Sequence, residues 1–313
     1  MFNWQGRVDT EDGERGQRWH QKVTMDGNQQ ERYSVALVGL ACDLGVAANK
    51  GRTGAAQGPD AIRAGMANLP WHWQANLVDY ANTVAERDLE DAQLAYAQVI
   101  ANAINIHDLV IGLGGGHEIA WGSYLGLERT LDKSAQSRVG IINFDAHFDL
   151  RRPAPHTSSG TPFRQIAEHR LAQGLAFDYA CLGVSKAANT PALFDFADTS
   201  GTRYLLDTDC EIDAAKALLL PMLEQVDQLY VTICLDAFSS SVAPGVSAPS
   251  ALGIEVSFVI KLLRWLAIQQ KALGYRWQLC DIAEMNPSLD VDGRTAKLAA
   301  RLGFEIVDSH LSR

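Results

Sequence analysis

The sequence lacks the features that mark membrane and secreted proteins. No apolar run approaches the roughly 18 to 20 residues needed to span a bilayer. Residues 1–21 are charged and polar and contain no apolar signal core. The five cysteines lie far apart and include no C-x-x-C pair, which argues against a disulfide framework and against a zinc finger. These absences predict a cytoplasmic protein with reduced thiols.

Basic residues are also scarce. The 27 Lys and Arg residues stand against 37 Asp and Glu, which gives a formal net charge of -10. This charge argues against a nucleic-acid groove or an anionic membrane surface as the main partner and favours a small-molecule substrate. The chain shows no internal repeat and no Pro/Ser-rich linker. We therefore expect one domain over residues 34–313, preceded by a polar N-terminal arm over residues 1–33.

Short apolar runs recur after this arm and predict the strands of a sheet. The eight runs cover residues 35–40, 77–80, 109–113, 139–144, 179–183, 203–206, 229–235 and 277–282. Amphipathic stretches of helical period lie between most of them, for example 89–106, 212–223 and 256–271. Strands that alternate with helices predict an α/β fold with a largely parallel eight-stranded sheet covered on both faces.

The most informative motif is Asp145-Ala-His147-Phe-Asp149, which directly follows one of these runs. Because side chains alternate along a strand, Asp145, His147 and Asp149 are expected to point to one side. Two carboxylates and an imidazole at a strand end are ligand types for a hard or borderline divalent metal. A structural explanation is open at this point: the aspartates cap a turn and the histidine is hydrogen-bonded in the core.

Three further polar groups follow expected strands, at the edge of the sheet where open α/β folds bind ligands. They are Gly-Gly-Gly-His117, Cys234-Leu-Asp236 and Glu284-Met-Asn-Pro. The glycines are not a phosphate loop, because no lysine follows them and their spacing matches neither nucleotide fingerprint. A helix is expected to start near His117. Each group alone has an ordinary structural explanation, but together they predict one site.

In their order and approximate spacing these groups resemble the ureohydrolase superfamily of arginases and agmatinases. The resemblance covers roughly residues 35–310. Three segments, 148–151, 158–164 and 243–249, are most similar to the formimidoylglutamase branch. Arginase-type enzymes instead carry Asn and His at the positions of Thr161 and Phe163.

This resemblance implies a three-layer αβα, arginase-like fold and a binuclear manganese centre with two Mn²⁺ per subunit. The ligand positions carried over are His117, Asp145, His147, Asp149, Cys234 and Asp236. At the position of Cys234 the superfamily more commonly has Asp. Pro244 lies ten residues after Cys234, as the family's loop proline lies ten residues after that Asp, and this spacing fixes the alignment. Because a thiolate leans toward zinc or iron, we expect one metal position to be weakly occupied or redox-sensitive. A Cys42 to Cys234 disulfide that expels metal is a further hypothesis.

The resemblance also implies an activity, that of a hydrolase of C–N bonds in linear amidines. The reaction is hydrolysis of N-formimidoyl-L-glutamate to L-glutamate and formamide in histidine catabolism, with a metal-bridged hydroxide attacking the amidine carbon. Asp149 would pass the water's proton toward the leaving amine, and Glu284 would pair with the formimidoyl N–H groups. The two substrate carboxylates call for cationic forks. Candidates to bind them are Arg151, Arg164, Thr161 and Arg52, with Asn189 as a further candidate.

Two other functions stay open on the sequence. An agmatinase or guanidinobutyrase type of ureohydrolase would release urea instead of formamide. A metal-binding pseudoenzyme, which the change at Cys234 keeps open, would hydrolyse none of these compounds. Members of the superfamily commonly assemble into rings, so the resemblance also allows a homo-oligomer.

Overall fold

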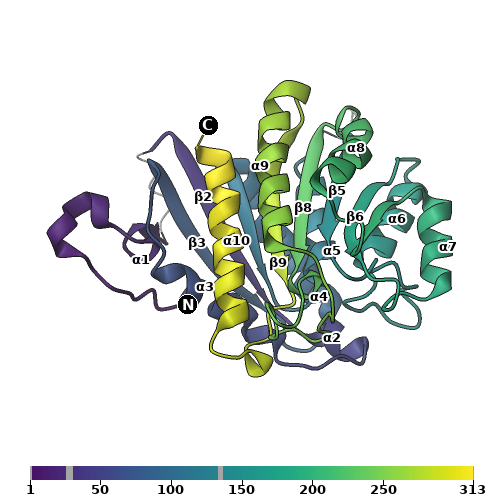
Figure 1. Ribbon diagram of the computed structural model, residues 1–313, viewed down its shortest axis with the longest axis horizontal. Coiled ribbons are helices and arrows are strands. Elements are labelled where there is room, and N and C mark those ends of the chain that lie inside the picture. The colour runs from purple at the N-terminus through teal and green to yellow at the C-terminus, as the bar shows by residue number, and fades with distance from the viewer. Residues whose placement is uncertain (1, 26–30, 133–136, 313) are drawn as a thin grey trace.

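A parallel nine-stranded sheet forms the centre of the computed structural model, which describes residues 2–25, 31–132 and 137–312 (Figure 1). The strand order is β1-β3-β2-β4-β9-β8-β5-β6-β7. The bounds are β1 Val23–Thr24, β2 Tyr33–Ala41, β3 Ala75–Val84, β4 Leu109–Gly114, β5 Val139–Phe144, β6 Asp178–Val184, β7 Arg203–Leu206, β8 Gln228–Cys234 and β9 Arg276–Ala283.

All eight predicted strands are present, as β2 to β9, and the prediction of an α/β fold is confirmed. The strand that the sequence did not indicate is β1, which pairs with β3 at one edge of the sheet. Its two residues are too few to form an apolar run. The strands β4, β5 and β6 are buried along their whole length. Parallel strands covered on both faces read as continuous apolar runs for this reason.

Helices cover both faces and complete three layers. The α-helices are α1 Trp19–Lys22, α2 Leu44–Ala48, α3 Gly58–Ala67, α4 Leu89–Ile106, α5 Ile119–Glu128, α6 Pro162–Ala172, α7 Pro191–Ser200, α8 Ile212–Leu223, α9 Val256–Leu273 and α10 Arg294–Leu311. The described residues also form the 3-10 helices η1 Thr10–Gly16, η2 Ala55–Gln57, η3 Leu235–Ala237 and η4 Pro287–Leu289. The helix expected near His117 is α5, and it begins at Ile119.

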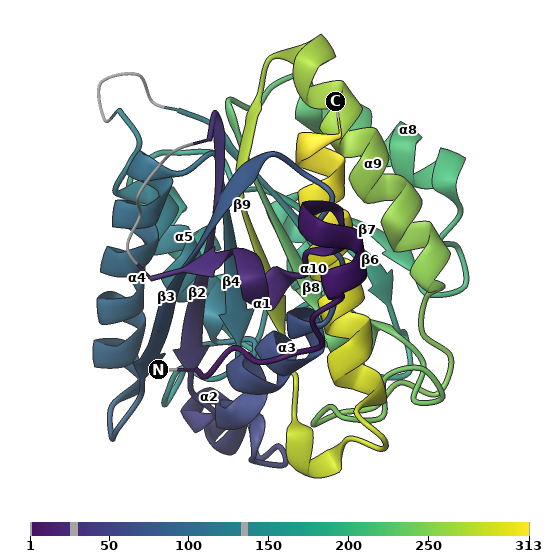
Figure 2. The same ribbon diagram turned by 90° about the vertical axis from the view of Figure 1, so that its left-hand side faces the viewer.

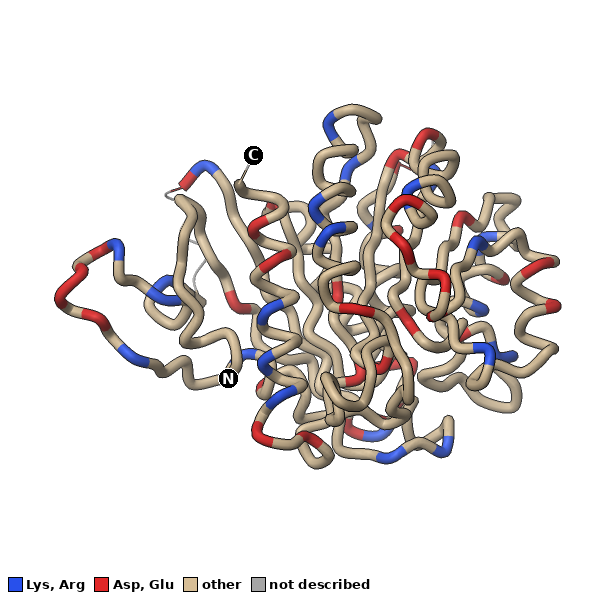
Figure 3. The backbone as a smooth tube through the Cα atoms, in the orientation of Figure 1, with Lys and Arg blue, Asp and Glu red and all other residues tan. Residues whose placement is uncertain are grey.

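Two apolar cores lie between these layers. One packs the side chains of α3, α8, α9 and α10 against the sheet, and the other packs those of α4, α5, α6 and α7 against its opposite face. Figure 2 shows the sheet edge-on between the two sets of helices. Acidic and basic positions are interspersed along the chain (Figure 3). Within the described ranges, no helix has both the length and the apolar character to cross a membrane.

The N-terminal segment lies against the edge of the sheet. The side chain of Trp19 is fully buried and packs edge to face on Trp71 and Trp73, with ring centroids 5.3 and 6.3 Å away. The indole N–H of Trp4 donates to Asp79 at 2.8 Å. Residues 1 and 26–30 of the expected arm lie outside the described residues.

Candidate metal centre

Four neighbouring strands bring the predicted ligands together. In the middle of the sheet the order is β4-β9-β8-β5. His117 follows β4, Glu284 follows β9, Cys234 ends β8 and Asp145 follows β5. Because the strands are parallel, their carboxyl ends meet at one edge, and side chains far apart in sequence converge there.

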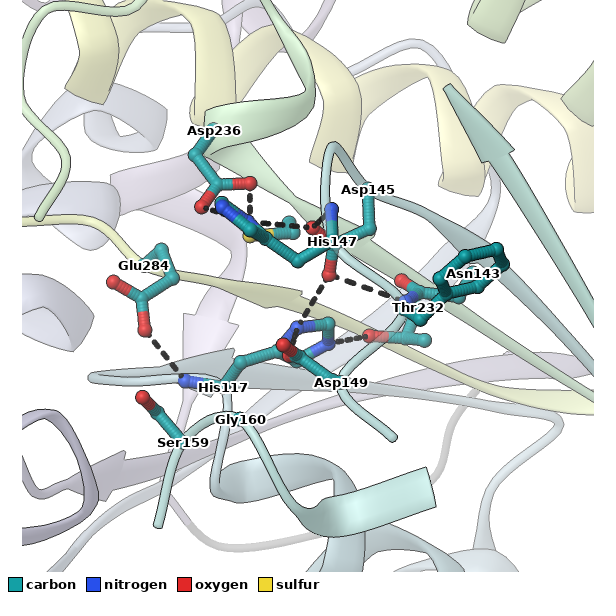
Figure 4. Close-up of polar contacts among 12 residues, drawn as sticks. His117, Asn143, Asp145, His147, Asp149, Ser159, Gly160, Thr232, Asp236 and Glu284 are labelled. Carbon is teal, nitrogen blue, oxygen red and sulfur yellow. Dashed lines mark hydrogen bonds and ion pairs between the residues drawn. The ribbon is translucent and has the colours of Figure 1, made fainter. Parts of the chain in front are cut away.

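Asp145 is the common member of two groups of donor atoms. His117, Asp145 and Cys234 each place one possible ligand atom within 4.8 Å of the others, and Asp145, His147 and Asp236 do the same. Figure 4 shows the side chains of His117, Asp145, His147 and Asp236 pointing toward one another. Two donor groups that share a carboxylate would be able to hold two cations, with Asp145 available to both.

The surroundings of His117 test whether a cation fits. Its Nδ1 atom is buried and has no partner of hydrogen-bond geometry in the described part of the chain. Yet Asp145 and Asp149 each bring an Oδ2 oxygen to 2.9 Å from this nitrogen. An imidazole nitrogen crowded by two carboxylates is a donor set that suits a divalent metal. The residues therefore fit the metal that the resemblance implies.

In the second donor group, His147 contacts both carboxylates. The backbone N–H of His147 donates to Asp145 Oδ1 at 2.7 Å. Its ring Nδ1 lies 3.2 Å from Asp236 Oδ2 and 3.5 Å from Asp145 Oδ1. The Cys234 thiol donates to Asp236 Oδ1 at 2.9 Å. Cys42 and Cys234 are both free and buried, and the proposed disulfide between them stays a hypothesis.

Burial and crowding shift the pKa values of this cluster in opposite directions. Burial, followed by the nearby charge of Asp145, raises the pKa of Asp149 to about 6. Burial, followed by the charge of Asp236, raises the pKa of Glu284 to about 8. Burial also acts on Asp145, but the adjacent imidazoles of His117 and His147 hold its pKa below the usual value. Crowded carboxylates of this kind gain most from a bound cation.

Asn189 fixes the loop that carries three of the ligands. Its Oδ1 accepts from Phe148 N–H at 3.0 Å, and its Nδ2 donates to Ala146 O at 2.8 Å and to Ser185 O at 2.9 Å. The sequence placed this residue among substrate candidates. Its amide group is instead bonded to the backbone of residues 146 and 148, so it positions the loop.

Two polar side chains that the sequence reading missed support individual ligands. Thr232 Oγ1 lies 3.0 Å from His117 Nε2, and Asn143 Nδ2 donates to Asp145 Oδ2 at 3.1 Å. Each precedes a predicted ligand by two residues, since Thr232 precedes Cys234 and Asn143 precedes Asp145. Strand alternation puts such residues on the same face, so this spacing is the sequence signal that identifies them.

A cavity of about 360 Å³ opens above the cluster. Its floor is formed by His117, His147, Asp149, Cys234, Asp236 and Glu284, and its rim by Asn49, Lys50, Gly51, Arg52, Arg151, Ser159, Ser247 and Ala248. A larger cavity of about 920 Å³ adjoins it and shares Asn49, Lys50 and Arg151. Charged groups of opposite sign thus face each other, with acids at the floor and cations at the rim.

Backbone strain concentrates in the same cavity. Five non-glycine residues in the described part have positive φ, and three of them line this cavity. They are Lys50 at 62°, Asp149 at 50° and Glu284 at 68°. Such backbone conformations cost on the order of 1 kcal/mol or more and persist where the surroundings impose them, often at functional sites. Lys50 has no motif context in the sequence and was not predicted.

The four predicted substrate residues divide into two pairs. Arg151 and Arg52 lie at the rim, while Arg164 and Thr161 line only the adjoining cavity. Arg151 makes no side-chain hydrogen bond or ion pair with any described residue. Arg52 is tethered, since its guanidinium donates to the backbone oxygens of residues 246 and 247 at 2.7 and 2.9 Å.

Arg164 and Thr161 have partners of their own. The Arg164 guanidinium donates to Glu168 at 2.5 Å and stacks on the Phe196 ring, 3.5 Å from its centroid. The Thr161 hydroxyl donates within the turn that starts α6, to the Ser158 carbonyl at 2.9 Å or to Gln165 at 2.8 Å. The structure therefore brings two of these four residues to the metal-site cavity and leaves two outside it.

Comparison with known proteins identifies the family. The model of the arginase family matches residues 33–308. The chain is 48% identical over 307 residues to the formimidoylglutamase of Hahella chejuensis, which covers 97% of this chain and 93% of that protein. It is 47% identical over 312 residues to the formimidoylglutamase of Ralstonia nicotianae, covering 97% and 94%.

A solved structure shows the same architecture. The formiminoglutamase of Trypanosoma cruzi, crystallised with Mn²⁺, superposes with a TM-score of 0.77 at 21% identity, covering 90% of this chain and 94% of that one. At this level of identity the superposition shows the shared fold. Together with the family match over most of the sequence, it leads to one conclusion: the chain belongs to the arginase family.

Proposed function

We propose that the chain hydrolyses N-formimidoyl-L-glutamate to L-glutamate and formamide in histidine catabolism. The observation that carries this proposal is the pair of donor groups that share Asp145 beneath a cavity with cations at its rim. A metal-activated hydrolase of an amidine needs the first feature, and a substrate with two carboxylates needs the second. The formimidoylglutamases that are 48% and 47% identical to the chain support this choice of substrate.

Six residues would hold two Mn²⁺ per subunit, namely His117, Asp145, His147, Asp149, Cys234 and Asp236. Asp145 would serve both ions, since it belongs to both donor groups. When bound, two divalent ions lower the pKa of the water between them and so supply a hydroxide nucleophile near neutral pH. The side chains at the cavity floor orient that water and the amidine. The same side chains carry out the proton transfers.

Cys234 makes one metal position different from the other. Burial, followed by the charges of Asp145 and Asp236, raises the pKa of its thiol well above the usual value. A cation must therefore displace a strongly held proton before the sulfur can bind. Sulfur is also a softer ligand than the carboxylate common in the superfamily. We expect this position to be filled less readily by Mn²⁺ and to depend on reductant.

We infer that Asp149 moves the proton of the reaction. It lines the cavity beside His117, and a carboxylate in this position is within reach of both the attacking water and the leaving amine of a substrate bound in the cavity. In the proposed reaction, Asp149 accepts the proton that the water gives up when it becomes hydroxide, and the hydroxide then forms the new C–O bond to the amidine carbon. It returns this proton to the glutamate nitrogen as the C–N bond breaks.

The position of Glu284 supports a role in orienting the amidine. One of its oxygens, Oε1, accepts the backbone N–H of His117 at 2.9 Å, which ties the carboxylate to the ligand loop. The carboxylate also lines the cavity. We infer that it pairs with the formimidoyl N–H groups and holds the amidine carbon over the floor.

Arg151 and Lys50 are the residues that best suit the two substrate carboxylates. Both are exposed at the rim, and neither has a polar side-chain partner among the described residues. A guanidinium binds a carboxylate through two parallel N–H donors, whereas an ammonium acts as a point charge. Arg52 lies at the same rim but is partly bonded to residues 246 and 247. Arg164 and Thr161 already have partners, and we assign them no contact with substrate.

The proposal is tested by identifying the products. Purified protein, loaded with Mn²⁺ under a thiol reductant, is expected to release formamide and glutamate in equal amounts from formimidoylglutamate, as measured by ¹H NMR. Agmatine and guanidinobutyrate serve as comparison substrates. Urea from either of these, with no formamide from formimidoylglutamate, would support the agmatinase type instead. No turnover of any of the three by manganese-loaded protein would favour a metal-binding pseudoenzyme.

We further infer a cytoplasmic enzyme that forms a homo-oligomer. The five free cysteines suit a reducing compartment, and the superfamily commonly forms rings. Light scattering of the purified protein at several concentrations measures the assembly, and a monomer at all of them would contradict this inference.

A further inference from the structure

The turn that begins α6 contacts the segment that carries Arg151, one of the two rim cations. The backbone N–H of Arg151 donates to the carbonyl oxygen of Gly160 at 3.0 Å. Gly160 is buried, and the preceding residue, Ser159, lines the metal-site cavity (Figure 4). The proposed reaction gives Gly160 no role.

The side chain of Arg151 crosses the place where any other residue at position 160 would carry its Cβ atom. A Cβ atom at this position would lie 2.9 Å from Arg151 Cδ and 3.3 Å from Arg151 Nε. It would also lie 3.1 Å from Nδ2 of Asn49. Non-bonded carbon atoms prefer a separation of about 3.5 to 4.0 Å. The missing side chain at Gly160 is therefore what allows the stem of Arg151 to lie here.

The turn around Gly160 is held by hydrogen bonds of its own. Thr161 Oγ1 accepts the backbone N–H of Ser158 at 2.9 Å, and the backbone N–H of Thr161 donates to the Ser158 carbonyl oxygen at 3.2 Å. The Ser158 hydroxyl accepts the Gly160 N–H at 3.3 Å. These three residues are buried, whereas Arg151 is exposed. A methyl group at position 160 would therefore displace the exposed side chain and leave the buried turn in place.

The same turn also contacts the segment of the other rim cation. Asn49 Nδ2 donates to Ser159 Oγ at 3.3 Å. Asn49 directly precedes Lys50, which lines the metal-site cavity together with Arg151 and Ser159. The turn thus lies where the two segments that carry the rim cations meet.

We propose that Gly160 is a positioning residue, which sets the place of the Arg151 guanidinium and thereby selects the length of the substrate. The inference rests on the proposed function, because it takes Arg151 as a carboxylate receptor. The amidine must reach the cavity floor while a carboxylate meets the guanidinium at the rim. These two points fix the separation of amidine and carboxylate, and so favour an N-formimidoyl dicarboxylate of glutamate length. A guanidinium binds a carboxylate through two parallel N–H donors, and a misplacement of about 1 Å can cost on the order of 100-fold in rate.

The test compares the steady-state kinetics of full-length variants loaded with Mn²⁺ under reductant. Gly160→Ala should raise KM for N-formimidoyl-L-glutamate about tenfold and change kcat by less than about threefold. The second substrate is N-formimidoyl-L-aspartate, which is one methylene shorter. The wild-type preference for the glutamate compound, as the ratio of the two kcat/KM values, should fall about tenfold in Gly160→Ala. Manganese content should stay unchanged.

A double variant separates the position of Arg151 from a general disturbance of the turn. Arg151→Met removes the guanidinium, so Gly160→Ala should change KM by less than about twofold in this background. A purely structural role of Gly160, or an effect through Asn49, would leave the tenfold rise intact there. A rise that persists in the Arg151→Met background would therefore overturn the inference.

The matched control is Gly303→Ala in α10. A Cβ atom at Gly303 would also meet a flexible side chain, that of Met66, but neither residue lines the metal-site cavity. KM and the substrate preference should stay at their wild-type values in this variant. The melting temperature of Gly160→Ala should lie within about 3 °C of the wild type, because an exposed side chain gives way.

A second variant serves if Gly160→Ala does not fold. Thr161→Val keeps the shape of the side chain but loses the oxygen that accepts the Ser158 N–H, so the turn loosens. KM should then rise about threefold, and this rise should be absent in the Arg151→Met background. An equal rise in both backgrounds would refute the inference.

The outcomes separate the role of Gly160 from the proposed function. Wild-type protein that releases no formamide from formimidoylglutamate would overturn the proposed function, and this inference with it. Wild-type protein that is active, with KM raised by Arg151→Met but not by Gly160→Ala, would overturn only the role of Gly160.

Discussion

The floor and the rim of the cavity are built in opposite ways. At the floor, His117 and Asp145 are buried and each is held by several polar contacts, such as those from Thr232 and Asn143. At the rim, Lys50 and Arg151 are exposed and have no polar side-chain partner in the described structure. A metal needs ligands that are fixed in advance. The unpaired cations at the rim can instead be paired by the carboxylates of the substrate. The contrast therefore predicts that substitutions at the floor abolish turnover, whereas substitutions at the rim weaken the binding of substrate.

The largest effect is expected at the shared ligand. Asp145→Asn keeps the size of the side chain but removes the charge that both donor groups have in common. Metal activation is worth several kcal/mol to the transition state, so kcat/KM should fall by at least about 1,000-fold. The measurements are kcat/KM for formimidoylglutamate and manganese content by mass spectrometry, which should fall at both positions.

An exposed aspartate provides the control for this change. Asp213→Asn on α8 removes an exposed charge that does not line the cavity, and it should leave both quantities unchanged. If Asp145→Asn kept two bound Mn²⁺, the shared position of Asp145 would have to be abandoned.

Rim changes should act on substrate affinity. Arg151→Met and Lys50→Met each remove a cation without touching a ligand, and a hydrogen bond to a charged group is worth about 1.5 to 3 kcal/mol. Each should raise KM about 10- to 100-fold with a much smaller effect on kcat. Steady-state kinetics at full manganese loading measure the two separately.

Two further cations sharpen this prediction. Arg164→Met should change KM less than about threefold, since Arg164 bonds Glu168 and lies outside the smaller cavity. Lys271→Met, at the end of α9, is a surface control with no expected effect. A large rise in KM for Arg164→Met, with none for Arg151→Met, would reverse the assignment of the carboxylate site.

The same contrast explains what could be predicted from the sequence. The floor follows strand ends, where alternation and apolar runs indicate direction, so the spacing predicted that Asp145 and His147 lie on one side, and the structure brings their side chains together. The rim comes from loops, where no period applies. Lys50 lies in no motif. The position of Arg164 in the sequence suggested that it binds substrate, but its guanidinium is already paired with Glu168, four residues later. The strand β1 was missed for a similar reason, because two residues show no pattern.

The support beneath the floor should be visible in stability. Asn189→Ala removes three hydrogen bonds to residues 146, 148 and 185 and leaves buried backbone groups unpaired. The free energy of unfolding should fall by about 1 to 3 kcal/mol, measured by urea denaturation of metal-free protein. Asn102→Ala, on the exposed side of α4, should change it by less than about 0.5 kcal/mol. Equal stability of the two variants would show that the loop does not depend on Asn189.

The smallest effect is expected at the one floor ligand that departs from the superfamily. Cys234→Asp replaces a protonated, soft donor by a carboxylate that can reach two ions with separate oxygens. Mn²⁺ affinity at the weaker position should rise on the order of tenfold, about 1.4 kcal/mol, and manganese content should no longer depend on reductant. Cys210→Ala removes a thiol that bonds the Leu206 carbonyl and should preserve the wild-type dependence. If the wild type binds two Mn²⁺ equally well without reductant, the Cys234 thiol does not hinder metal binding. The two metal positions would then have equal affinity, contrary to this prediction.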